Sequence, residues 1–236
     1  MTTVLFVRHG LTALTGPVLA GWTPGVHLDE RGHAQVASLG ERLLAVPLAA
    51  VVTSPLDRCR ETATAVLAGR RPVPALHVDE RLGEVRYGSW TGRELKELRK
   101  DPLWRVVQGH PSAAVFPDGE GLAAMAARAA EAVRDWNARL GPDATYAVVS
   151  HADVIKALVA DALGLHLDEF QRIVVDPASL TVVRYADLRP FVVRVNDTGG
   201  SVDALVPGPP ARRSRGRRAH GPGPAPDAAV GGGAGE

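Results

Sequence analysis

The sequence near the N-terminus reads Val4-Leu5-Phe6-Val7-Arg8-His9-Gly10. Four consecutive apolar residues are typical of a short strand buried on both faces, as in a parallel sheet covered by helices. The run stops where the sequence changes to arginine and histidine. Two later apolar runs stop in a similar way, at Thr53-Ser54-Pro55 and at Ser150-His151. The pattern predicts a buried sheet whose strands each end in polar residues.

The segments between these runs favour helices. Apolar residues recur at helical spacing in four of them, and two further apolar runs near the end predict a closing pair of strands. The expected helices cover about 30–44, 55–67, 120–140 and 154–163, and the expected closing strands cover 180–185 and 191–195. Alternating strands and helices indicate an α/β fold. We predict a three-layer α/β/α sandwich with a mostly parallel central sheet.

Composition separates the chain into two parts. Of 236 residues, 45% are hydrophobic and 5% aromatic, which is enough for one large core built from aliphatic side chains. The C-terminal segment is rich in Gly, Pro and Arg and poor in large apolar groups, so its burial cannot offset the entropy of ordering. We therefore expect one domain over residues 1–200 and a disordered tail over 201–236.

Charge and cysteine usage exclude several classes of protein. The formal net charge is +1, from 27 basic and 26 acidic residues, which argues against a nucleic-acid-binding domain. The single cysteine, Cys59, permits neither an intrachain disulfide nor a CxxC metal site. The N-terminal apolar run is too short for a signal peptide, and no stretch has the length of a membrane span. These features predict a cytoplasmic protein with no membrane partner, and they leave oligomer formation open.

The polar residues at the strand ends point to an anion site. Carboxyl ends of parallel strands share one edge of a sheet, so Arg8, His9, Arg58 and His151 are expected to converge. Ser-x-x-Asp patterns beginning at Ser54 and at Ser150 predict capped helix N-termini, which attract anions. A guanidinium group binds phosphate through a planar fork and keeps its charge. The expected ligand is therefore a dianionic phosphate group.

Four ordered segments resemble the signatures of the histidine phosphatase superfamily, branch 1, the phosphoglycerate-mutase-like proteins. One such motif alone is weak evidence, whereas four in the family's order are strong. The matching positions are Val7-Arg8-His9-Gly10 with Thr12; Thr53 to Ala63; Leu82, Glu84, Gly88, Trp90 and Gly92; and Val149-Ser150-His151 with Val154-Ile155.

The resemblance implies a role for each matching residue. His9 would be the nucleophile that becomes a phosphohistidine, and Glu84 would donate a proton to the leaving group. The phosphoryl oxygens would be held by Arg8, Arg58, His151 and Thr15, the last standing where the family commonly has Asn. The family requires no metal and no cofactor, and cations around the phosphate supply the stabilisation of charge instead.

The predicted function is a metal-independent phosphatase that acts on a small phosphorylated metabolite through a phosphohistidine. A phosphoglycerate-mutase-type phosphomutase is the first alternative. The short segment 93–119 argues against it, because mutases enclose their substrate under a longer segment. A non-catalytic phospho-ligand binder is the second alternative, although it would be expected to lack His9, Glu84 or His151. Departures from the family at Leu11, Thr91 and Ala152 leave the substrate open.

Overall fold

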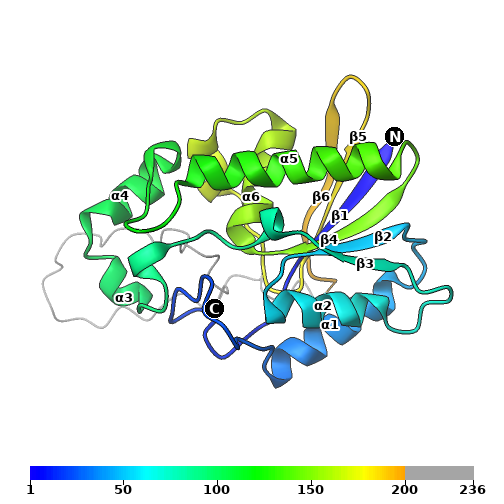
Figure 1. The fold of residues 1–236 in the computed structure, drawn as a ribbon, viewed down its shortest axis with the longest axis horizontal. Coiled ribbons are helices and arrows are strands. Elements are labelled where there is room, and N and C mark those ends of the chain that lie inside the picture. Colours follow the sequence, from blue (N-terminus) through cyan, green and yellow to red (C-terminus); the bar gives the residue numbers. More distant parts are fainter. Residues whose placement is uncertain (200–236) are drawn as a thin grey trace, which may run out of the picture.

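A computed structural model describes residues 1–199 of the chain, so the predicted tail over 201–236 lies outside the described residues. Within the described part, one sheet of six strands runs in the order β3-β2-β4-β1-β5-β6. The strands are β1 (Thr2–Arg8), β2 (Ala50–Thr53), β3 (Ala75–Val78), β4 (Thr145–Ser150), β5 (Leu180–Tyr185) and β6 (Pro190–Asp197). Figure 1 shows the strands side by side through the centre of the molecule.

Strand direction fixes where the strand ends lie. The neighbours β3, β2, β4 and β1 are parallel, while β5 pairs antiparallel with β1, and β6 pairs antiparallel with β5. Arg8, the last residue of β1, pairs in register with Ser150, the last residue of β4. The carboxyl ends of the two central strands are therefore level, as the predicted site requires.

Helices cover both faces of the sheet. The α-helices are α1 (Glu30–Leu43), α2 (Asp57–Leu67), α3 (Leu95–Leu98), α4 (Pro102–Gly109), α5 (Leu122–Leu140) and α6 (Ala152–Leu163). Short 3-10 helices are η1 (Glu80–Leu82), η2 (Gly88–Trp90), η3 (Pro111–Ala113) and η4 (Leu167–Arg172). Helices α1 and α2 lie on one face and α5 and α6 on the other (Figure 1). The predicted α/β/α sandwich with a mostly parallel sheet is confirmed.

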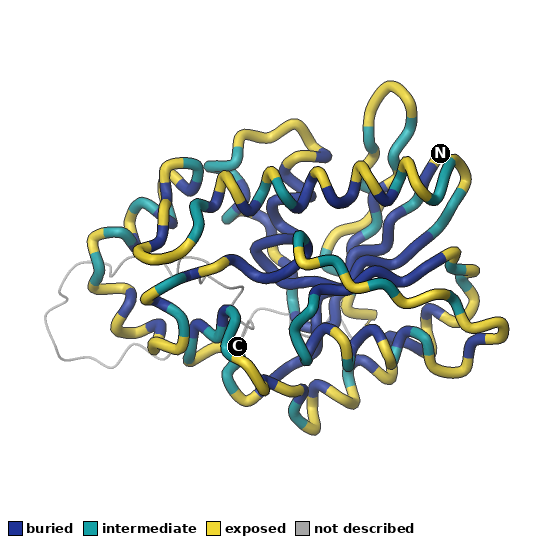
Figure 2. Tube along the Cα trace, in the orientation of Figure 1, coloured by how far each residue is buried: buried dark blue, intermediate teal, exposed yellow. Residues whose placement is uncertain are grey.

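The alternation of side chains along β1 explains the two covered faces. Val4 and Phe6 belong to the cluster that packs with α5 and α6, and Leu5 and Val7 to the cluster that packs with α1 and α2. Successive strand residues point to opposite faces, so an all-apolar strand supplies two cores. In Figure 2 the central strands are buried along most of their length, while the outer sides of the helices are exposed.

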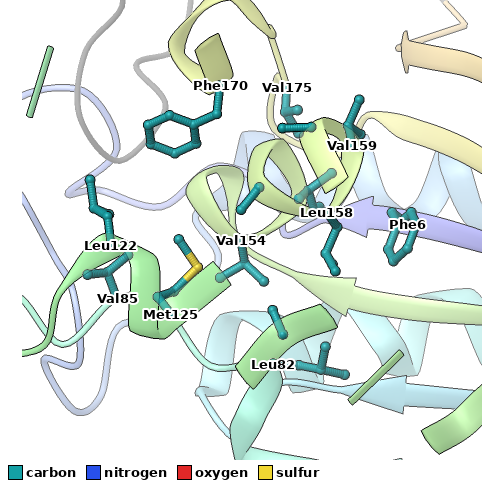
Figure 3. Close-up of a cluster of buried hydrophobic side chains, with 14 of the residues drawn as sticks. Phe6, Leu82, Val85, Leu122, Met125, Val154, Leu158, Val159, Phe170 and Val175 are labelled. Carbon is teal, nitrogen blue, oxygen red and sulfur yellow. The ribbon is translucent and has the colours of Figure 1, made fainter. Parts of the chain in front are cut away.

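The larger core also anchors a loop that carries a predicted site residue. Leu82 and Val85 flank Glu84, and both are completely buried. Figure 3 shows Leu82 and Val85 in the same cluster as Met125 of α5 and Val154 of α6. This loop is therefore fixed on both sides of Glu84 by apolar packing.

Two local predictions were wrong, and one strand was missed. Helix α2 begins at Asp57, and its N-cap residue is Leu56 rather than Ser54, whose hydroxyl instead contacts His151. Helix α6 has His151 at its N-cap position, while Ser150 ends β4 and donates to the carbonyl of Leu82. Strand β3 was not predicted, because as an edge strand it is largely exposed and lacks a buried apolar run.

None of the helices in residues 1–199 combines the length and the apolar composition needed to cross a membrane.

Candidate active site

The predicted residues converge at the carboxyl edge of the parallel strands. Arg8 ends β1 and His9 follows it, His151 follows β4, and Arg58 lies in the first turn of α2. All four side chains are buried. The imidazole rings of His9 and His151 are 5.3 Å apart between centroids, although the two residues lie far apart in the chain. The structure thus places these groups together as the strand pattern predicts.

The hydrogen bonds of His9 define its tautomer. Its Nδ1 lies 2.7 Å from the carbonyl oxygen of Gly10, so Nδ1 carries the proton and donates. The Nε of Arg58 donates to His9 Nε2 over 3.2 Å, so Nε2 holds a lone pair. Burial, Arg58 and Arg8 together lower the pKa of His9 well below its usual value. His9 is therefore a neutral imidazole with its lone pair on Nε2.

Gly10 is needed for this arrangement because the chain passes close to α1. A Cβ atom at residue 10 would lie 2.8 Å from the carbonyl oxygen of Gly32 and 2.8 Å from a methyl group of Val36. Any side chain at this position would push the loop away from α1 and displace the carbonyl that orients His9.

The two buried arginines are held by backbone carbonyls. Arg8 Nη1 donates to Val175 over 2.7 Å, and Arg58 Nη2 donates to Gly21 over 2.9 Å. Among the described residues, Arg58 Nη1 is buried and has no hydrogen-bond partner. Burial lowers the pKa of Arg8 to about 10, which still leaves it charged at neutral pH. Two fixed positive charges thus lie beside His9, and at least one N–H group has no acceptor from the protein.

His151 is also neutral. Arg58 Nη2 contacts its Nδ1 at 3.2 Å, and its Nε2 lies 2.8 Å from the hydroxyl of Ser54. Burial lowers the pKa of His151 well below its usual value, and the charge of Arg58 lowers it further. Its Nδ1 is 3.8 Å from a carboxyl oxygen of Glu84, but a neutral imidazole does not form an ion pair there.

Glu84 is a buried carboxyl group next to these cations. It lies in the loop between η1 and η2, and its Oε1 accepts the backbone N–H of Val85 over 2.9 Å. Burial raises the pKa of Glu84 to about 7, and the nearby charge of Asp153 adds to the rise, while Arg58 opposes it. A carboxyl group with this pKa holds its proton for part of the time at neutral pH and can donate it.

Two residues that the sequence did not reveal hold the Glu84 backbone. The carbonyl oxygen of Glu84 accepts from Arg128 Nη2 over 3.0 Å and from Trp22 Nε1 over 2.5 Å. Arg128 Nη1 also donates to the carbonyls of Arg81 at 2.6 Å and Gly83 at 2.9 Å. Nothing in the sequence separates Arg128 from an ordinary helix arginine or Trp22 from a packing aromatic residue.

Cys59 is not a competing nucleophile. It is completely buried, and its Sγ lies 3.5 Å from His151 Nε2. Burial raises the pKa of the Cys59 thiol to about 12, although Arg58 acts in the opposite direction. The thiolate is the reactive form of cysteine, so a thiol that stays protonated is inert.

A pocket lies over His9, with a volume of about 420 Å³ that includes the solvent-filled space at its opening. Arg8, Arg58, Glu84 and Thr15 also line it. The hydroxyl of Thr15 is 3.0 Å from both the backbone nitrogen and the hydroxyl of Thr12, so it is already engaged locally. His151 is completely buried and is not one of the lining residues, although it lies beside His9 and Arg58.

The arranged groups can bind an anion, attack its central atom and protonate the oxygen that departs. Fixed guanidinium groups attract a tetrahedral oxyanion and bring its central atom near His9 Nε2. A neutral imidazole can attack that atom, and a protonated carboxyl group at Glu84 can supply a proton to the departing oxygen. These three capacities occur together in one pocket.

Comparison with known proteins finds similar sequences and structures. The family model described as "Histidine phosphatase superfamily (branch 1)" matches residues 4–198. The solved structure of Bacillus stearothermophilus YhfR superimposes with a TM-score of 0.76 and 31% identity, covering 84% of this chain and 98% of that one.

Two curated relatives illustrate the range of similar proteins. Phosphoserine phosphatase 1 of Hydrogenobacter thermophilus is 30% identical over 72% of this chain and 81% of its own length. A bifunctional protein of Mycobacterium tuberculosis is 33% identical over 84% of this chain but only 54% of its own length. The chain therefore spans about half the length of that relative.

Proposed function

The chain belongs to the histidine phosphatase superfamily, branch 1, and on that basis we propose that it is a metal-independent phosphatase acting on a small phosphomonoester. His9 Nε2 attacks phosphorus, an N–P bond forms, and the P–O bond to the alcohol breaks. The proton of Glu84 goes to the departing alcohol oxygen. Water then attacks the phosphohistidine and gives a proton to Glu84, which releases phosphate and restores His9.

The tautomer of His9 is the observation that carries this proposal. The hydrogen bond from His9 Nδ1 to the Gly10 carbonyl leaves the lone pair on Nε2. This atom lies beside Arg58, which would hold the phosphoryl group. An imidazole attacks only when neutral, and the lowered pKa keeps His9 neutral across the physiological range. The nucleophile needs no separate general base.

Arg8 and Arg58 are proposed to stabilise the charge that spreads over the phosphoryl oxygens. Electrostatic stabilisation by preorganised cations is usually the largest contribution to phosphoryl transfer. Both guanidinium groups are buried and tied to backbone carbonyls, so they need little reorganisation when the substrate binds. In the proposed reaction they fill the place that a metal ion takes in other phosphatases.

Phosphoglycerate-type isomerisation is the competing activity. A mutase must protect its phosphohistidine from water while the intermediate reorients. The segment after the Glu84 loop forms α3 and α4, and its Leu98, Trp104 and Val107 are buried in the larger core. These residues are committed to packing and do not form a long cover over the pocket, which favours hydrolysis.

We expect phosphate release from small phosphomonoesters to persist in EDTA. Incubation with 3-phosphoglycerate should give at most slow phosphate release and little 2-phosphoglycerate, since water reaches the phosphohistidine. Phosphate is followed by a colorimetric assay, and the two phosphoglycerates by NMR. Isomerisation that outpaces hydrolysis would favour the mutase, and activity restored only by added metal would contradict the metal-independent mechanism.

Arg128→Ala is expected to slow the hydrolysis of alkyl phosphates by about 10- to 100-fold, because Glu84 would lose a main-chain anchor and move from its donating position. Hydrolysis of p-nitrophenyl phosphate, whose leaving group needs no proton, should fall far less. The matched control is Arg134→Ala on the same helix, where the arginine is exposed and pairs with Asp161. Equal losses on both substrates would show that Arg128 supports the fold rather than Glu84.

A further inference from the structure

Part of the pocket lining is an apolar wall. Leu14, Val18, Leu19, Ala20 and Leu95 line it, from two segments that are distant in sequence. Leu19 and Leu95 are buried. Thr12, Thr15, Gly16 and Gly21 also line the pocket, so the aliphatic side chains supply part of the surface against which the portion of a substrate beyond the phosphate would rest.

Backbone hydrogen bonds hold this wall in place. Leu19 N donates to Arg93 O over 2.9 Å, and Gly92 N donates to Leu19 O over 2.8 Å. Leu95 N donates to Pro17 O over 2.9 Å, so the two segments are joined at three points. The wall is formed before any substrate binds, and a preformed wall selects substrates without a cost of ordering.

Few of the side chains that line the pocket are charged. Among the described lining residues, the charged side chains are Arg8, Arg58 and Glu84, all close to His9. Lys96 follows the apolar wall in sequence, but it does not line the pocket, and its Nζ lies 2.5 Å from the carboxylate of Glu94. The described wall thus offers no cation to a second anionic group of a substrate.

We propose that the phosphatase acts on monoesters of uncharged alcohols with an apolar portion next to the ester oxygen, and that it discriminates against substrates bearing a carboxylate. This substrate class rests on the proposed function. A carboxylate facing aliphatic side chains would lose water without gaining a partner. It would also face the carboxylate left on Glu84 after proton donation, and like charges close together in a buried site repel.

The test uses two esters that differ in one group. Glycerol 3-phosphate and 3-phosphoglycerate have the same size, with a hydroxymethyl group in one where the other has a carboxylate. We expect kcat/KM for glycerol 3-phosphate to exceed that for 3-phosphoglycerate by about tenfold or more, and butyl phosphate to be at least as good as glycerol 3-phosphate. Equal or better turnover of 3-phosphoglycerate would overturn the proposed class.

Two variants test whether the apolar wall causes the preference for the uncharged ester. Leu14 is half-buried, so a lysine there can reach the pocket. Leu14→Lys should reduce the ratio of kcat/KM for glycerol 3-phosphate to kcat/KM for 3-phosphoglycerate by about fivefold or more. The uncharged Leu14→Met should leave this ratio near the wild-type value. An unchanged ratio in Leu14→Lys, with p-nitrophenyl phosphate still hydrolysed, would refute the role of the wall. If the wild type hydrolysed none of these esters, that result would instead contradict the proposed function itself.

Discussion

His9→Ala is expected to reduce kcat for every phosphomonoester by about 10³-fold or more, because the variant has no group at the position of the nucleophile. Rapid quench of the wild type in alkaline detergent during turnover of a ³²P-labelled substrate should trap a phosphoenzyme. The label should be stable in base and labile in acid, as a phosphoramidate is. Peptide mapping should place it on His9, and the variant should carry none.

The control for this experiment is His33→Ala. His33 is an exposed histidine on α1, and it does not line the pocket. This variant should keep both the phosphoenzyme and the wild-type rate. A phosphoenzyme that persists in His9→Ala, or label that maps to another residue, would refute His9 as the nucleophile.

The sequence predicted the convergence at the site because that convergence depends on strand order and strand ends. Apolar runs ending in Arg8-His9 and in Ser150-His151 indicate parallel strands with polar carboxyl ends, and the register of β1 on β4 brings them level. Burial on both faces follows from the same runs. These properties are local in the sequence, so they could be predicted without a structure.

Features that depend on tertiary contacts could not be predicted. The hydroxyl of Ser54 was expected to cap α2, but it lies 2.8 Å from His151 across the strand ends, and no local pattern shows that competition. Arg128 lies far along the chain from the Glu84 loop that it holds, and helix arginines are normally solvated. The sequence gives residue types, whereas these contacts depend on which elements become neighbours.

The protonation of Glu84 is another property of the fold. In the sequence it is one carboxylate in a loop, which would normally be ionised. In the structure Asp153 is also completely buried, and its Oδ2 accepts from the hydroxyl of Tyr87 over 3.0 Å. Burial first, and then the charge of Asp153, raise the pKa of Glu84 to about 7. Proton donation at neutral pH therefore depends on packing that brings α6 next to this loop.

The proton that Glu84 is proposed to donate should matter most when the leaving group is a poor one. Glu84→Gln removes the proton but keeps the size of the side chain, so alkyl phosphates should be hydrolysed about 10²- to 10⁴-fold more slowly. For p-nitrophenyl phosphate, whose phenolate departs without a proton, the loss should stay below about tenfold. In the wild type, kcat for alkyl esters should fall as pH rises above about 7, because Glu84 loses its proton there.

The pH profiles separate a proton donor from a residue that only supports the fold. Below the pKa of Glu84 the wild type should hold its rate on alkyl esters, since the lowered pKa of His9 keeps the nucleophile neutral as the solution becomes more acidic. The alkaline decline should vanish in Glu84→Gln, leaving a low and flat profile. If the variant lost activity equally on both classes of ester and kept the alkaline decline, the proton would come from another group, and Glu84 would serve only the packing of its loop.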